Sequence, residues 1–115
     1  MSETVTLKAN EYLMHEGEES TEMYYLQTGN LAIFKRKGNI ENQIGTIMAG
    51  ELVGEMSFLD KKPRSASVKA MSDSTLVVIP LDKFERLLAS MPKWFGALLH
   101  TLTDRLRKAN ARIKV

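Results

Sequence analysis

Short apolar runs separated by turn residues fill the sequence from Val5 to Pro80. Runs of this length, bounded by Gly, Asn and Asp, are typical of an antiparallel sandwich or barrel. Gly29-Asn30 fits a tight hairpin turn and Lys37-Gly38-Asn39 a longer one, because Gly and Asn accept the positive φ that such turns require. The pattern predicts strands over these ranges: Val5–Ala9, Tyr12–His15, Met23–Gln27, Leu31–Arg36, Gln43–Met48, Ser65–Met71 and Thr75–Ile79.

Helical spacing replaces this alternation after Pro80. Asp82, with Glu85 three residues later, has the spacing of a capping box and predicts a first helix over 82–90. Pro92 disfavours helical geometry at the residue before it and suits the start of a second helix, over 93–113. We therefore expect a β-domain over residues 5–80 followed by two helices, within one domain over residues 1–115.

The second helix carries an apolar heptad stripe. A stripe of this kind can pack on the β-domain of its own chain, close as a lid over a ligand, or pair with a second copy. It is longer than a small β-domain needs for cover, which favours a homodimer. Its members recur at steps of four and three residues: Phe95, Leu99, Leu102, Leu106, Ala109 and Ile113.

Basic residues flank this stripe at positions where we expect them to face solvent: Arg105, Arg107, Lys108 and Arg112. Such a run could touch nucleic acid or anionic lipid, but a solvated helix face is the commoner role. At the start of the helix, Trp94 and Phe95 are expected to anchor it against the strands.

Composition excludes several classes of protein. The chain has 115 residues, 43% of them hydrophobic and 26% charged, as in an ordinary globular domain. It has no cysteine, so a disulfide scaffold, a thiol nucleophile and a Cys-based metal site are excluded. His15 and His100 are the only histidines, too few for a histidine-rich metal centre. We expect no metal and no catalytic cofactor.

The net charge of +2 hides an uneven distribution. Residues 1–30 carry six glutamates against one lysine, whereas residues 93–115 carry six basic residues against one aspartate. The N-terminus has no basic segment followed by an apolar one, and no window approaches 18 consecutive apolar residues. We expect a cytoplasmic protein without membrane contact.

The segment over residues 50–68 is the one that ordinary packing explains least. Met56-Ser57-Phe58-Leu59 has the length of a one-turn helix, and a helix N-terminus can bind an anion through its free N–H groups. Arg64, placed after the rigid Pro63, could meet a phosphate with two charge-assisted hydrogen bonds, each worth about 1.5–3 kcal/mol. Glu55 would repel a phosphate and instead suits a sugar hydroxyl. The combination describes a site for a nucleoside monophosphate.

A surface ion pair between Glu55 and Arg64 is the alternative. A single ion pair, however, would not need the glycine before the glutamate, the proline before the arginine or the small residues that follow.

This segment resembles the phosphate-binding cassette of the cyclic-nucleotide-binding domain family, which reads Gly-Glu, small or apolar residues, a short loop, and then Pro-Arg with small residues. Upstream, four further segments of the sequence resemble the family's β-roll landmarks: Glu16-Gly17-Glu18, Tyr24-Tyr25-Leu26, Gly29 and Gly50-Glu51. The resemblance implies a mainly β fold with C-terminal helices: an antiparallel, jelly-roll-like β-roll with a short cassette helix, a cassette over residues 53–67 and a long C-terminal helix.

The resemblance also implies residue roles. Glu55 would bind the ribose 2′-hydroxyl, Arg64 the cyclic phosphate, and backbone amides near Ser57 and Ser65 would complete the phosphate cradle. Asn110 falls near the positions that contact the base, and its amide suits adenine without excluding guanine. The ligand is then cAMP, favoured over cGMP, and the expected ligand-binding residues are Gly54, Glu55, Met56, Ser57, Arg64, Ser65, Ala66 and Asn110.

The implied function is that of a sensor and not of an enzyme. Regulators of the catabolite activator type continue from the long helix into a helix-turn-helix domain, whereas this sequence ends at Val115. We expect no direct DNA binding, and a bacterial stand-alone sensor that signals to a downstream protein or through its own homodimer. The expected lid and dimer helix residues are Leu99, Leu102, Arg105, Leu106, Ala109 and Ile113.

Three possibilities stay open. Arg105 could pair with Glu55 in the nucleotide-bound state and so couple ligand occupancy to the position of the last helix. The β-roll could instead be a constitutive scaffold that does not respond to ligand. A small jelly-roll enzyme of the cupin kind is the third reading, and it would need more histidines.

Overall fold

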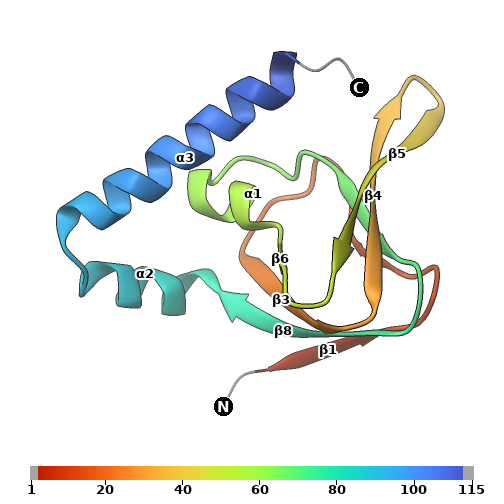
Figure 1. Cartoon of the computed structure of the whole chain (residues 1–115), viewed down its shortest axis with the longest axis horizontal. Coiled ribbons are helices and arrows are strands. Elements are labelled where there is room, and N and C mark those ends of the chain that lie inside the picture. The colour runs from red at the N-terminus through yellow and green to blue at the C-terminus, as the bar shows by residue number, and fades with distance from the viewer. Residues whose placement is uncertain (1–2, 113–115) are drawn as a thin grey trace.

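The computed structural model describes residues 3–112, with side chains described through residue 109. Within that range the chain forms eight strands and then, apart from one short helix between strands, two C-terminal helices (Figure 1). This architecture confirms the expected fold class. The elements are β1 (Thr4–Leu7), β2 (Tyr12–Met14), β3 (Glu22–Thr28), β4 (Asn30–Lys37), β5 (Ile40–Met48), β6 (Leu52–Val53), α1 (Glu55–Asp60), β7 (Ser67–Ala70), β8 (Ser74–Pro80), α2 (Leu81–Ala89) and α3 (Lys93–Arg112).

The described strands form two four-stranded sheets, in the orders β1-β8-β3-β6 and β2-β7-β4-β5. Every pairing within them is antiparallel. β4 and β5 make the longest hairpin, with Leu31 opposite Ile47 at its base and Lys37 opposite Ile40 at its tip. The two sheets make the β-roll.

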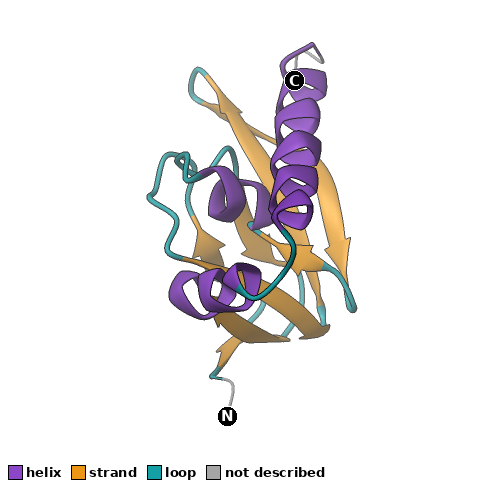
Figure 2. Ribbon diagram, turned by 90° about the vertical axis from the view of Figure 1, so that its left-hand side faces the viewer, coloured by secondary structure: helices purple, strands orange, loops and turns teal. Residues whose placement is uncertain are grey.

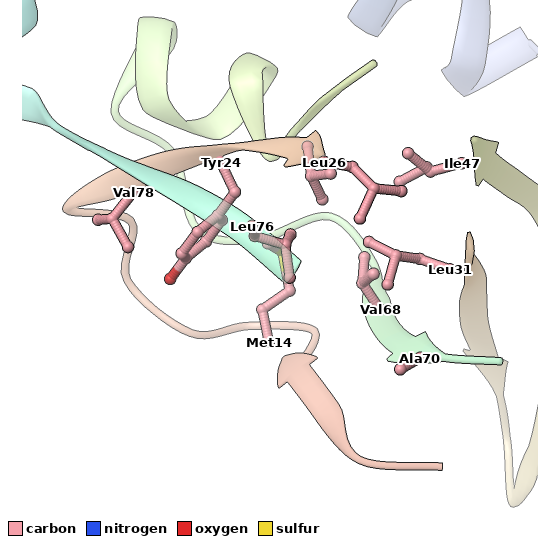
Figure 3. Packing of buried hydrophobic residues seen from close by; sticks show 10 residues of the cluster. Met14, Tyr24, Leu26, Leu31, Ile47, Val68, Ala70, Leu76 and Val78 are labelled. Carbon is pink, nitrogen blue, oxygen red and sulfur yellow. The ribbon is translucent and has the colours of Figure 1, made fainter. Parts of the chain in front are cut away.

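The core lies between the two sheets (Figure 3). In β8 the buried positions Ser74, Leu76 and Val78 alternate with half-buried ones, as expected for a strand with one face on a core. Each aliphatic side chain removed from water in this way stabilises the fold by about 1.5–3 kcal/mol. The buried cluster consists of Met14, Tyr24, Leu26, Leu31, Ile47, Val53, Val68, Ala70, Leu76 and Val78.

The helices gather on one side of the sheets (Figure 2). The predicted capping box at the start of α2 is wrong: the helix begins at Leu81, its N-cap is Pro80, and no side-chain cap bond is present. Strand β8 runs directly into the helix through Pro80, so Asp82 lies inside the first turn. There it pairs with Arg86 at 3.1 Å instead of capping the helix.

Several strand predictions differ from the structure. β1 ends at Leu7 instead of Ala9, and β5 begins at Ile40 instead of Gln43. β6, over Leu52–Val53, was not predicted, because a two-residue strand has no alternation to detect and is recognisable only by its pairing with β3. β7 begins at Ser67, two residues later than predicted, where its pairing with β4 begins. Ser65 and Ala66 therefore lie in the part of the cassette that precedes β7.

The heptad stripe of α3 divides into two parts. Phe95 and Leu99 are half-buried. Leu102 and Leu106 are 47% and 51% exposed, and Ala109 is also exposed, while Ile113 lies outside the described residues. The predicted aromatic anchor is wrong for Trp94, which is 66% exposed, whereas the adjacent Phe95 is half-buried.

Candidate functional site

The start of α1 forms one edge of the site. Gly54 is the N-cap residue of α1, with φ of +76°, and its carbonyl accepts a hydrogen bond from the Phe58 amide at 3.2 Å. Phe58 is buried and meets Phe84 of α2 edge to face, with ring centroids 5.2 Å apart. The cassette helix is therefore held against its neighbours by an aromatic contact, and its first turn is left facing the site.

Arg64 is the central charge of the site. Its side chain is buried, with only 6% of the residue exposed. Nη1 donates to the Gly54 carbonyl at 3.1 Å, and Nη2 donates to the Glu22 carbonyl at 2.7 Å. A surface ion pair with Glu55 does not describe this residue, because the bonds go to main-chain oxygens and the guanidinium is out of solvent.

The main chain of Arg64 is held as firmly as its side chain. The Arg64 amide donates to the Glu18 carbonyl, and the Gly17 amide donates to the Arg64 carbonyl, both at 2.8 Å. The turn between β2 and β3 thus pairs with the end of the cassette. This contact gives a physical role to the Glu16-Gly17-Glu18 landmark of the sequence.

Burial changes the proton equilibria around Arg64. Burial lowers the pKa of the Arg64 guanidinium, while Tyr24 and the carboxylates of Glu22, Glu18 and Glu55 oppose that shift. Because arginine ordinarily titrates above about 12, it remains a cation near neutral pH. Burial, followed by a 2.7 Å hydrogen bond to Glu22, raises the pKa of the Tyr24 hydroxyl, which therefore stays neutral.

A pocket of about 850 Å³ opens above Arg64. This volume is in the usual range for a small-molecule site, about 300–1,000 Å³. Seven of the predicted ligand-binding residues line it: Gly54, Glu55, Met56, Ser57, Arg64, Ser65 and Ala66. The eighth, Asn110, belongs to α3, but its side chain lies outside the described residues.

The β4–β5 hairpin supplies a wall that the sequence analysis missed. Ile33 of β4 together with Ile44 and Ile47 of β5 makes its apolar part, and Lys35 and Lys37 extend it. Alternate residues of a strand share a face, so positions 33, 35 and 37 could have been grouped once β4 was placed beside the cassette. An apolar wall opposite a buried cation suits a ligand with a flat ring at one end and an anion at the other.

Arg107 of α3 also lines the pocket. The prediction that it faces solvent is wrong: its side chain is 19% exposed and pairs with Asp60 of α1. Arg105, in contrast, is exposed. Its pairing with Glu55 was expected only in the nucleotide-bound state, and it stays a prediction.

The described residues hold no group of three or more His, Asp or Glu side chains arranged to bind a metal ion. None of the described helices has the length and apolar character needed to cross a membrane.

The fold and pocket together define a β-roll ligand-binding domain. The cyclic nucleotide-binding domain profile matches residues 4–91, and the chain belongs to this family. It is 33% identical over 86 residues to a cAMP-dependent protein kinase regulatory subunit of Emericella nidulans, covering 75% of this chain and 20% of the relative. It is 29% identical over 102 residues to the cyclic AMP receptor protein of Thermus thermophilus, covering 88% of this chain and 47% of the relative. The chain thus spans less than half the length of either relative.

Solved structures show the same fold. The EAL enzyme Bd1971 in its cAMP-bound form superposes with a TM-score of 0.86 and 27% identity, over 95% of this chain and 29% of that protein. Its cGMP-bound form gives a TM-score of 0.85 and 25% identity, over 96% of this chain and 30% of that protein.

Proposed function

We propose that this chain is a sensor that binds a cyclic nucleoside monophosphate, with cAMP favoured over cGMP. The observation that carries the proposal is the buried guanidinium of Arg64. Among the ion pairs of the described residues none includes Arg64, although buried charges in proteins are normally paired. Two of its five N–H donors are used by carbonyls, so donors remain for an anion in the pocket.

A cyclic phosphate has the chemistry to complete this site. Its oxygens would accept from Arg64 and from amides near Ser57 and Ser65. Glu55, in the first turn of α1, would accept from the ribose hydroxyl. The apolar wall of the hairpin would cover the base. Support for this ligand class comes from the EAL enzyme Bd1971, which was solved in both cAMP-bound and cGMP-bound forms.

The choice of cAMP rests on the amide of Asn110, whose donor and acceptor would pair with the adenine edge. The proposed output is non-enzymatic: ligand binding changes the position of α3, and α3 passes the signal to a second copy of the chain or to a downstream protein. A ligand can shift such an equilibrium only by its differential affinity for the two helix positions. The exposed residues Leu102 and Leu106 provide the surface for the dimer.

Isothermal titration with cAMP and with cGMP tests this function. The wild type should bind, and Arg64→Ala should lose at least about thirtyfold in affinity, because removing one partner of a buried charge pair costs about 2–5 kcal/mol. Arg64→Lys keeps the charge but loses the two-pronged hydrogen-bonding geometry. Its affinity should therefore lie between those of the wild type and Arg64→Ala. Arg86→Ala, an arginine whose side chain is 77% exposed on α2, serves as the matched control and should bind like the wild type.

Thermal unfolding of each variant shows whether lost binding reflects a lost fold. A wild type that binds neither nucleotide would contradict the proposal and favour the constitutive scaffold. Equal affinity of the wild type and a folded Arg64→Ala variant would contradict the role of the arginine.

A further inference from the structure

A set of polar bonds joins α3 to the cassette helix. Nε of Arg107 donates to one carboxylate oxygen of Asp60 at 2.5 Å, and Nη2 donates to the other at 3.1 Å. Nη2 also donates to the Ser57 hydroxyl at 3.2 Å. The two charged residues are 47 positions apart in the sequence, so this two-pronged contact exists only when α3 lies over α1.

This ion pair differs from the others among the described residues. The side chains of Arg107 and Asp60 are 19% and 12% exposed, whereas both partners of every other described ion pair are at least 50% exposed. Exposed pairs contribute little because water and salt screen them. A shielded pair with two parallel hydrogen bonds is both stronger and more demanding in geometry.

The pair also connects α3 to the binding pocket. Arg107 lines the pocket together with Ser57, the residue that it bonds on α1. The position of α3 therefore decides whether this part of the wall is present. Asp60 is not among the residues that line the pocket in the described part of the chain, so its effect on a ligand has to pass through Arg107 or through α1.

Among the described residues, Arg107 is the one residue of α3 whose side chain donates hydrogen bonds to α1. Thr103 is buried, but its hydroxyl donates to the Leu99 carbonyl of its own helix. The neighbouring apolar residues Leu102 and Leu106 are about half exposed. The bonds of Arg107 are therefore the main specific attachment between this part of the helix and the cassette.

We propose that Arg107 is a positioning residue that holds α3 over the cassette through Asp60, and that helix docking and nucleotide binding reinforce one another through this pair. The coupling to nucleotide binding rests on the proposed function, whereas the docking of α3 through this ion pair does not. A phosphate bound near Ser57 fixes α1, α1 carries Asp60, and Asp60 holds Arg107. By linkage, a docked α3 strengthens ligand binding by the same factor by which bound ligand strengthens the docking of α3.

The test combines amide hydrogen exchange of α3 with titration of cAMP and cGMP. Asp60→Asn, Arg107→Gln and the double variant are compared with the wild type. Lys108→Gln is the matched control: it removes one positive charge from the adjacent position of the same helix, where Lys108 makes only an exposed pair with Asp104. Because Arg107 lines the pocket and Asp60 does not, Asp60→Asn is the decisive variant.

We expect each single variant to speed exchange in α3 and to weaken nucleotide binding by about tenfold, within the usual range of coupling between sites. In the double variant, α3 exchange should be no faster and nucleotide binding no weaker than in the more affected single variant, since both substitutions break the same contact. Lys108→Gln should match the wild type in exchange and in affinity.

Two outcomes would overturn the inference. One is α3 exchange in Asp60→Asn that equals the wild type, whatever happens to affinity. The other is faster exchange with unchanged affinity, which would remove the coupling. If the wild type binds neither nucleotide but both single variants still speed α3 exchange, the positioning role is supported and only the proposed function fails.

Discussion

The guanidinium of Arg64 lies against the main chain of Gly54 at a distance that no other residue type at position 54 would allow. Nη1 donates to the Gly54 carbonyl at 3.1 Å, and a Cβ added to Gly54 would lie 2.3 Å from that same nitrogen. Gly54 also has a φ of +76°, which L side chains rarely adopt. The Gly-Glu and Pro-Arg halves of the cassette are therefore one structural unit.

Gly54→Ala should displace Arg64 and abolish nucleotide binding. The new methyl group would occupy the space of Nη1, and the guanidinium would have to leave the Gly54 carbonyl. We expect at least about a thirtyfold loss of affinity, comparable to that of removing the arginine. Titration calorimetry measures the loss, and urea unfolding measures the accompanying change in stability.

Gly50→Ala is the control for backbone strain in that experiment. Gly50 has a φ of +96°, but a Cβ there would meet nothing within 4 Å. It should lose about 1–2 kcal/mol of stability and retain affinity. If both alanine variants lost affinity equally, backbone strain and not displacement of Arg64 would be the cause.

The Asp60–Arg107 pair predicts a contribution to stability that is lost in acid. Burial alone would raise the pKa of Asp60, but hydrogen bonds from Arg107 and from the Lys62 amide, with the charges of both residues, lower it below the ordinary value of 3.8. A carboxyl group with a lowered folded-state pKa stabilises the fold fully above its unfolded-state pKa, about 3.9, and loses that contribution as the pH falls through the folded-state value.

Urea unfolding of the wild type and Asp60→Asn measures this contribution. The difference in the free energy of unfolding should be constant from pH 7 to pH 5 and should shrink below about pH 4. Asp104→Asn, which breaks the exposed pair with Lys108, should give a smaller difference that disappears in high salt. A wild-type advantage that vanished near pH 6, or that persisted unchanged at pH 2, would contradict this assignment.

The exposed leucines of α3 predict self-association. Leu102 and Leu106 are 47% and 51% exposed, and a second helix pairing with them would remove this apolar surface from water. We expect the wild type to sediment as a dimer at tens of micromolar and Leu102→Glu to sediment as a monomer. Ile40→Glu, which changes an apolar residue that is 65% exposed at the hairpin tip, should remain dimeric.

A monomeric wild type would contradict the dimer, and a dimeric Leu102→Glu variant would place its interface elsewhere. Both results leave the nucleotide pocket untouched, because Leu102 is not among the described residues that line it.

Local chemistry made the strands and the cassette predictable. Alternation and turn residues located seven of the eight described strands, and the spacing of Gly54, Glu55, Pro63 and Arg64 pointed to one site. These signals are short in range, because a glycine with positive φ or a proline before an arginine constrains its own neighbourhood whatever the rest of the chain does.

The start of α2 shows the limit of such local signals. Asp82 and Glu85 have the spacing of a capping box, yet β8 continues through Pro80 and the helix starts one residue earlier. β6 had no local signal, since a two-residue strand is defined by its partner β3. In both cases hydrogen bonding to a distant strand outweighed local preference.

The sequence by itself determined the strand order along the chain, the cassette and the charge that it carries. Tertiary structure decided which partners those residues meet: the Glu22 carbonyl that holds Arg64, the hairpin wall, and the inward position of Arg107. Periodicity showed an apolar stripe on α3, but not how the helix is rotated about its axis. That rotation depends on the cassette surface on which the helix rests, and a bond such as Arg107 to Asp60 forms only after segments 47 residues apart have packed together.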